Sequence, residues 1–178
     1  MSIEYSVNGN TNQLHQYYAL RERCYRRELG IADFDGSEEE QDRQGQLLLA
    51  LRDGECIGGV RIGGYVTWPS QLEPLGLQVE RCCMWERFVI EPRVRTVQLA
   101  QSFCSHLIDF SIELGFRHAM ILSSLRNARF YRRYHSALGV DFRIHRPVPH
   151  CAEGSFAGLE HYLSVAYLDA DQPLKIAV

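Results

Sequence analysis

The chain has 178 residues, of which 46% are hydrophobic and 23% charged, so it can bury one core and has the composition of an ordinary globular domain. Its formal net charge of −3 gives no general attraction for nucleic acid, and no run of about 20 apolar residues could span a membrane. The N-terminus, MSIEYSVNGN, lacks the pattern of a signal peptide. We therefore expect one domain over residues 1–178, located in the cytoplasm, with no nucleic-acid partner and no membrane span.

The first predicted element is an amphipathic helix. Residues 11–29 carry apolar and aromatic side chains at three- and four-residue spacings, among them Leu14 and Tyr18, and Gly30 is a residue at which a helix can end. The next segment, IADFDGSEEEQDRQG at residues 31–45, is polar and acidic. We expect it to be a loop that is long enough to serve as a lid.

Strands and two further helices are predicted after this loop. Two apolar runs on either side of Asp53-Gly54 predict a β-hairpin, and residues 79–90, VERCCMWERFVI, predict one long strand. A helix is expected over residues 96–115, with Val97 at the start of its apolar stripe. The strand HAMILSSL, the helix RNARFYRRYHSAL and strands around DFRIH and YLSVAYL complete the chain. This order predicts a mixed α/β domain.

Cysteine and histidine give no sign of a metal site. The six cysteines show no C-x-x-C spacing and lie mostly in apolar segments, which favours reduced, buried thiols over disulfides or structural zinc. His145, His150 and Cys151 lie close together in the sequence and raise the alternative of nucleophilic chemistry or a metal site. No other residue supplies the missing ligands at a recognisable spacing, so we expect no bound metal.

The stretch WERFVIEPRVRTVQLAQSF combines the end of the long strand, a charged turn and the start of a helix, where a phosphate can bind. Its turn, RTVQLA, resembles the phosphate-binding motif of the GNAT acyltransferases, Arg/Gln-x-x-Gly-x-Gly/Ala, with Arg95 and Ala100 in place and Gln98 at a glycine position. The resemblance implies the GNAT fold, an α/β arrangement in which a central mixed, mostly antiparallel sheet is flanked by helices. It also implies that these three residues contact the phosphate of the acyl donor.

Other segments resemble one branch of that family, the acyl-homoserine-lactone synthases and the related N-acyl amino acid synthases. They are LRERCYRRELG, the acidic loop with the hairpin that follows it, and ERFVI in the long strand; the segment ILSSLRNARFYRRYHSALGV resembles the branch's strand, Ser124 turn and arginine-rich helix. The positions that the resemblance assigns to substrate binding are Arg21, Tyr25, Glu39, Asp42, Arg61 and Arg87. It implies acyl and pantetheine binding by Phe88, Val89, Ile90 and Ser124.

The sequence departs from this branch at two places. The branch usually carries a glutamate three residues before the arginine of the long strand, and this chain has Met84 there, with Glu80 and Glu86 as the nearby acids. The lactone synthases also favour tryptophan shortly after the first helix, where this chain has Ile31 and Phe34. The second departure favours acylation of an amino acid over formation of a lactone.

Acyl transfer from a thioester to an amine requires a neutral amine, hydrogen-bond donors for the developing oxyanion and a proton for the departing thiolate. Glu86 is the candidate general base or water-positioning residue, although it could instead be an ion-pair partner of Arg87 or Arg61. Tyr131 is the candidate proton donor. Tyr134 is better explained by packing, because it continues a four-residue apolar spacing along the same helix.

The five charged residues Arg21, Glu39, Asp42, Arg61 and Arg87 have two open interpretations. Arginine could hold the carboxylate of an amino-acid acceptor while the acids hold its ammonium group. The same residues could instead form a structural ion-pair network that orders the acidic loop.

We therefore predict an N-acyltransferase that moves an acyl group from acyl carrier protein or acyl-CoA to the amine of an amino acid or related small molecule. No cofactor is expected to be permanently bound. The alternatives are a conventional acetyl-CoA-dependent N-acetyltransferase and a non-catalytic relative that binds acyl groups or a carrier protein. Docking of the acidic carrier protein would use an arginine patch, with the candidates Arg93, Arg95, Arg129, Arg132 and Arg133.

Overall fold

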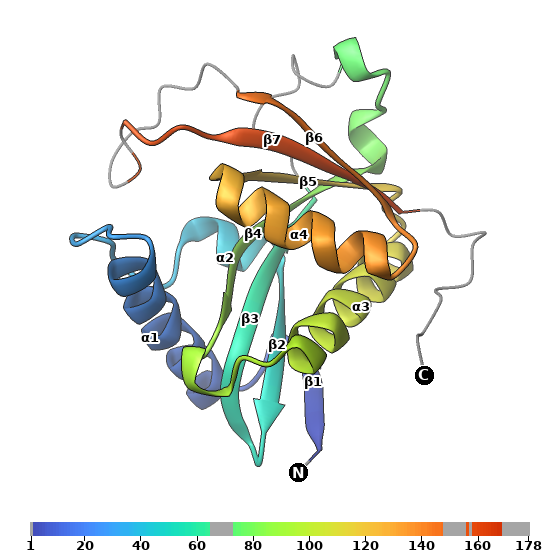
Figure 1. Ribbon diagram of the computed structural model, residues 1–178. Helices are drawn as coiled ribbons and strands as arrows, with labels where there is room; N and C mark the ends of the chain where they lie inside the picture. Colours follow the sequence, from blue (N-terminus) through green and yellow to red (C-terminus); the bar gives the residue numbers. More distant parts are fainter. Residues whose placement is uncertain (1, 65–72, 148–155, 157, 169–178) are drawn as a thin grey trace.

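The computed structural model describes residues 2–64, 73–147, 156 and 158–168 (Figure 1). The helices are α1 (Thr11–Glu28), α2 (Glu40–Gln44), α3 (Val97–Glu113) and α4 (Leu125–Ala137). The strands are β1 (Ile3–Val7), β2 (Gln46–Arg52), β3 (Glu55–Gly63), β4 (Cys82–Ile90), β5 (His118–Ser123), β6 (Asp141–Pro147) and β7 (Tyr162–Tyr167). None of the helices described is both long and apolar enough to cross a membrane.

The seven strands form one sheet in the order β1-β2-β3-β4-β5-β7-β6. Every neighbouring pair is antiparallel except β4 and β5, which run parallel. That parallel contact is short, because only Cys82–Met84 pair with His118–Met120. Beyond it the two strands splay apart, as Figure 1 shows, and the second half of β4 has a strand partner on its β3 side alone among the described strands. The expected mixed, mostly antiparallel sheet flanked by helices is confirmed.

Both faces of the sheet are covered. Leu47, Leu49 and Leu51 of β2 point toward α1, while Leu48 and Ala50 lie in the larger core with α3 and α4. Side chains alternate between the faces of a strand, so a strand buried on both sides is apolar throughout. This explains the uninterrupted apolar run LLLAL.

The predicted helices are present, with boundaries set by identifiable caps. Asn10 caps α1, one residue before the predicted start, Thr96 caps α3 and Ser124 caps α4, each through a side-chain oxygen that accepts a backbone N–H. The structure differs from the predictions in four details. The strand β1 was not predicted, and α2 lies within the expected loop. The strand predicted over residues 79–90 begins at Cys82, because Val79–Arg81 form a 3₁₀ turn. Val97 of the predicted apolar stripe is 56% exposed because it sits on the outer first turn of α3.

Glycine at position 59 of β3 allows α1 to approach the sheet closely. A Cβ atom there would lie 2.4 Å from two ring carbons of Tyr17, which is itself fully buried. We expect Gly59→Ala to lower the free energy of unfolding by about 1–3 kcal/mol, because the ring has no space into which to move. Chemical denaturation of this variant and of Gly64→Ala, where the added Cβ would meet the Phe116 ring at 3.3 Å, measures the effect. Equal stabilities of the two variants would contradict the expectation.

Candidate active site

The strand β4 contains a β-bulge where the resemblance places the acyl group. Past the pair Arg61–Glu86, β4 has one more residue than β3 before the next pair, and Arg87 adopts a left-handed φ of 56°. The hydroxyl of Tyr17 in α1 donates a hydrogen bond to the Arg87 carbonyl oxygen at 2.9 Å, which fixes the bulge from the helix side. The bulge also lets Glu86 and Arg87, neighbours that would otherwise point to opposite faces, lie on the same face of the sheet.

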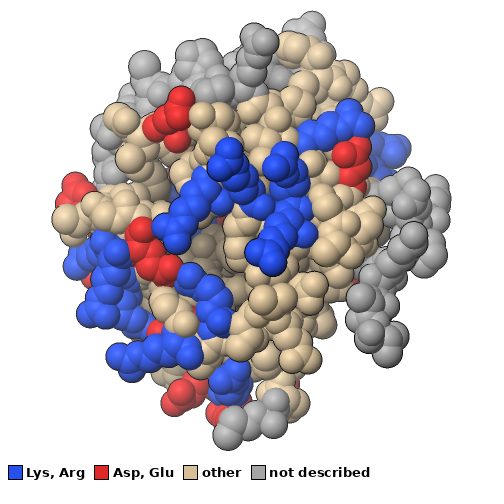
Figure 2. Space-filling view, in the orientation of Figure 1, with Lys and Arg blue, Asp and Glu red and all other residues tan. Residues whose placement is uncertain are grey.

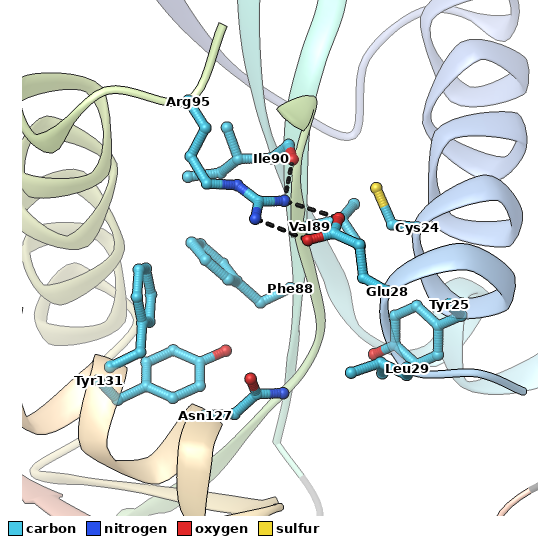
Figure 3. A pocket seen from close by; sticks show the side chains of 11 residues that line it. Cys24, Tyr25, Glu28, Leu29, Phe88, Val89, Ile90, Arg95, Asn127 and Tyr131 are labelled. Carbon is cyan, nitrogen blue, oxygen red and sulfur yellow. Dashed lines mark hydrogen bonds and ion pairs between the residues drawn. The ribbon is translucent and has the colours of Figure 1, made fainter. Parts of the chain in front are cut away.

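A cleft of about 120 Å³ opens where β4 separates from β5. Its walls come from β4, from the C-terminal turns of α1 and from the first turns of α4, with one residue from the turn after β4 (Figure 3). The lining residues are Cys24, Tyr25, Glu28, Leu29, Phe88, Val89, Ile90, Arg95, Asn127, Phe130 and Tyr131.

Three polar side chains are directed into this cleft. In Figure 3 the hydroxyl of Tyr131 points from α4 toward Phe88 of β4, and Tyr25 and Asn127 contribute a hydroxyl and an amide at the same end. Tyr131 is 5% exposed, and burial, followed by the proximity of Tyr25, raises its pKa well above the usual value. The Tyr131 hydroxyl therefore keeps its proton at neutral pH and can donate a hydrogen bond to charge that develops in the cleft.

At the other end of the cleft, Arg95 bridges two walls. Its guanidinium donates to both carboxylate oxygens of Glu28 at 2.7 and 2.8 Å and to the carbonyl oxygen of Ile90 at 2.6 Å (Figure 3). Arg95 immediately precedes the capped N-terminus of α3. In that first turn Gln98 is exposed and Ala100 is buried.

A buried ion-pair network lies on the other side of the bulge, and Asp42 is at its centre. The fully buried carboxylate of Asp42 accepts from Nη1 of Arg21 at 3.0 and 3.1 Å and from Nη1 of Arg61 at 2.9 Å. It also accepts the backbone N–H of Glu39 at 2.8 Å. Arg21, which is completely buried, donates further to backbone carbonyls at positions 36–37. Asp42 thus joins α1, β3 and the acidic loop.

Glu39 extends the network to the bulge. It accepts from Arg61 Nη1 at 2.6 Å and from the Nε and Nη2 atoms of Arg87 at 2.8–3.2 Å. Burial opposes its ionisation, but the contacts with Arg87 and Arg61 outweigh burial and lower the pKa of Glu39 to about 2. Glu86 joins through its Oε2, which accepts from Arg61 Nε and Nη2 at 3.1 and 3.0 Å. Three arginines therefore face three carboxylates, and the network is electrically neutral.

Aromatic rings surround the Arg87 guanidinium. Its Cζ lies 5.9 Å from the centre of the Tyr25 ring, 5.6 Å from that of Phe34 and 5.0 Å from that of Phe156. Tyr25 also lines the cleft. The network and the cleft thus meet at Tyr25 and the β4 bulge.

The structure therefore divides the residues predicted for the site into two adjoining groups. The charged residues assigned to the acceptor lie in the network together with Glu86, and Tyr131, Phe88, Val89, Ile90 and Arg95 lie around the cleft. Tyr25, also assigned to the acceptor, lines the cleft and faces Arg87, whereas Gln98, Ala100 and Ser124 do not line the cleft. Ser124 is exposed and serves as the cap of α4.

Among the described residues, no acid takes the place of the glutamate that the branch carries at the position of Met84. Met84 is 1% exposed and packs with Cys82, Met120 and Leu163 in a small apolar cluster. Glu86 points to the network instead, where it forms the ion pair with Arg61 that was one of its two interpretations.

Several lining residues were not predicted. Cys24, Glu28 and Leu29 follow helical spacing along α1 toward the cleft, and Asn127 and Phe130 do the same on α4. The spacing shows that each set shares a helix face. It does not show that the two faces meet across splayed strands.

The cysteines within the described ranges are unpaired, and four of these five are buried. The prediction for His150 and Cys151 lies outside the described residues. Among the residues that are described, no three His, Cys, Asp or Glu side chains are grouped so as to hold a metal ion.

A buried histidine supports the helix that carries Tyr131. His135 is completely buried against Trp85, at 5.0 Å between ring centres, and its Nδ1 lies 2.8 Å from the Tyr131 carbonyl oxygen. Nδ1 must donate there and therefore carries a proton. Nε2 is buried without a hydrogen-bond partner among the described residues, so it is the nitrogen that lacks a proton in the neutral ring. Burial, partly offset by this hydrogen bond, lowers the pKa of His135 to about 4.

This histidine should make stability depend on pH. The unfolded chain binds the proton near pH 6.5 and the folded chain near pH 4, so the unfolded state binds more protons between these values. We expect the free energy of unfolding to fall by about 2 kcal/mol from pH 7.5 to pH 5, and most of that fall to be absent in His135→Leu. Denaturation curves at both pH values measure it. An unchanged pH dependence in the variant would contradict the assignment. His118 and His145, whose pKa values burial also lowers, contribute in the same direction in both proteins.

A bulged strand beside a splayed neighbour, with a protonated tyrosine and an arginine at the two ends of the resulting cleft, is the arrangement expected of an acyltransferase that binds a thioester. The sequence profile of the Acetyltransferase (GNAT) family matches residues 14–136. The chain therefore belongs to this family of acyltransferases. No curated protein sequence matched the chain.

Solved structures of two kinds share the fold. The acyl-homoserine lactone synthase LasI superposes with a TM-score of 0.67 at 15% identity, covering 95% of this chain and 91% of its own. An N-acetyltransferase from Staphylococcus aureus Mu50 gives 0.67 at 12% identity and covers 95% and 99%. The CoA-dependent acyl-homoserine lactone synthase BjaI gives 0.64 at 17% identity and covers 95% and 85%. At these identities the likeness establishes the fold alone.

Proposed function

We propose that this protein transfers an acyl group from a pantetheine thioester, carried by coenzyme A or by acyl carrier protein, to the amine of an amino acid or related small molecule. The observation that carries the proposal is the position of the buried network directly behind the β4 bulge, with Tyr25 shared between network and cleft. The cleft would hold the donor and the network side the acceptor. The amine would approach the thioester carbon across the bulge.

The residues support each step of such a transfer. As the C–N bond forms and the C–S bond breaks, the amine loses a proton and the thiolate gains one. Backbone N–H groups of Phe88–Ile90, on the bulged half of β4, are the donors proposed for the oxyanion. Tyr131 would stabilise the departing thiolate. Glu86 would accept the amine proton through water, held in place by Arg61.

The arginines around the cleft support a phosphate-bearing and acidic donor. Figure 2 shows basic side chains gathered around a hollow on the face that α4 crosses. Four exposed arginines of α4 and the exposed Arg93 form no ion pair with the described residues. The α4 arginines are Arg126, Arg129, Arg132 and Arg133. Docking of an acidic carrier protein on this patch would weaken as salt rises.

Mass spectrometry of extracts from cells that express the protein tests the proposal. New N-acyl products should appear in cells with the wild-type chain and be strongly reduced in cells with Tyr131→Phe at equal protein level. Extracts identical to those of cells without the protein, from cultures supplied with amino acids, would count against it.

The matching family profile favours a second candidate, a conventional acetyl-CoA-dependent N-acetyltransferase, because that profile describes the Acetyltransferase (GNAT) family. The N-acetyltransferase from Staphylococcus aureus Mu50 also superposes as well as LasI does. Comparing acetyl-CoA with octanoyl-CoA and decanoyl-CoA as donors distinguishes the two. Preference for the short donor would support acetylation, and preference for the long donors would support transfer of a fatty acyl group.

A further inference from the structure

The contact between Glu28 and Arg95 closes one end of the cleft. It joins the last turn of α1 to the turn between β4 and α3 through two hydrogen bonds of 2.7 and 2.8 Å, one to each carboxylate oxygen (Figure 3). Both side chains line the cleft. The two residues are 67 positions apart, so the pair forms only when the domain is folded.

The carboxylate of Glu28 thus binds the guanidinium of Arg95, which is the group best placed to bind a phosphate of the acyl donor. Arg95 precedes the N-terminus of α3, whose first turn contains no acidic residue and would attract an anion. Two parallel N–H groups of arginine bind a carboxylate and a phosphate in the same geometry. The contact with Arg95 lowers the pKa of Glu28, so its carboxylate remains charged at neutral pH. Glu28 and a phosphate of the acyl donor therefore compete for the same N–H groups of Arg95.

We propose that Glu28 is a specificity-determining residue, an internal anion that a donor phosphate must displace from Arg95. The proposal rests on the proposed function, because it assumes that the cleft binds a pantetheine thioester. Each partner is 35% exposed, so the pair is weakened by water and can exchange. The phosphodiester of a carrier protein and the pyrophosphate of coenzyme A present two or more phosphate oxygens to the same N–H groups and can replace the carboxylate, whereas a thioester without phosphate cannot.

Two ligands that differ by one phosphate test this directly. Binding of acetyl-phosphopantetheine and of acetyl-pantetheine is measured by calorimetry for the wild type, Glu28→Gln, Arg95→Gln and the double variant. We expect Glu28→Gln to tighten binding of acetyl-phosphopantetheine about two- to fivefold, because removing one partner of an exposed ion pair releases an interaction of that size. Binding of acetyl-pantetheine should be unchanged. Arg95→Gln should weaken the phosphate-bearing ligand, and in that background Glu28→Gln should give no gain.

Asp141→Asn is the control, since it removes the acid of the exposed Asp141–Arg143 pair on β6, away from the cleft, and should leave both affinities unchanged. Equal tightening of both ligands by Glu28→Gln, no tightening, or a gain that persists without Arg95 would overturn the inference while leaving the proposed function intact. Failure of the wild type to bind either ligand would overturn both.

Discussion

Replacing Tyr131 with phenylalanine is expected to lower kcat about 100-fold with little change in KM for the donor. The hydroxyl is the group lost, and it points into the cleft from a ring that is almost completely buried (Figure 3). Its raised pKa keeps the hydroxyl protonated, so in the proposed mechanism it would donate a hydrogen bond to the departing thiolate. A positioned acid of this kind typically contributes 10²–10⁴-fold, and we expect the lower end because a tyrosine of high pKa transfers its proton late. Initial rates of thiol release measure the effect.

Tyr134→Phe is the matched control for this prediction. Tyr134 is on the same helix, half-buried, with its ring 4.7 Å from that of Phe130, and it does not line the cleft. Removal of the Tyr134 hydroxyl should change kcat by less than about twofold relative to the wild type. Similar kcat values for Tyr131→Phe and Tyr134→Phe would show that the Tyr131 hydroxyl takes no part in the reaction.

Asp42→Asn is expected to lower the free energy of unfolding by about 3–5 kcal/mol. Asp42 is fully buried and accepts hydrogen bonds from Arg21 and Arg61, which are themselves 0% and 2% exposed. Removal of the charge leaves two buried guanidinium groups with less compensation. Part of the loss should appear as opening of the acidic loop, because Asp42 also holds the Glu39 backbone N–H. Urea denaturation gives the free energy, and hydrogen exchange locates the opening.

The corresponding change at the surface provides the comparison. In Asp141→Asn the ion-pair partners are more than half exposed, so we expect a loss of less than about 1 kcal/mol. If Asp42→Asn cost no more than this control, the network would not be what orders the loop. Substrate binding would then be the better explanation for its charges.

Much of the fold could be predicted from local patterns. The helices α1, α3 and α4 combine an apolar face with a glycine just past the end, and Gly30, Gly115 and Gly139 all adopt the left-handed φ that ends a helix. The strand β1 was missed because it is only five residues long and half-exposed, and its stability comes from pairing with β2. The helix α2 was missed because its signal, a capping box between Glu39 and Asp42, lies within a segment whose acidity suggested a loop.

The ion-pair network could be predicted from the sequence, whereas most of the cleft could not. The network residues were predicted as a set because a family resemblance fixes their spacing, and the structure brings them together. The cleft depends on how α1 and α4 face one another across the gap between β4 and β5. No sequence pattern gives that distance, so Glu28 and Asn127 were not predicted. Nor could the sequence show that Arg95, expected to bind phosphate, already holds a carboxylate.

The most direct test of the central claim is a reaction of the purified protein with acyl-CoA or acyl carrier protein and a mixture of amino acids, in which thiol release and N-acyl products are measured together. Our account predicts that thiol and N-acyl product form in a 1:1 ratio and that both require the amine. Thiol release without an N-acyl product, or no reaction with any acyl donor from two to twelve carbons, would contradict it.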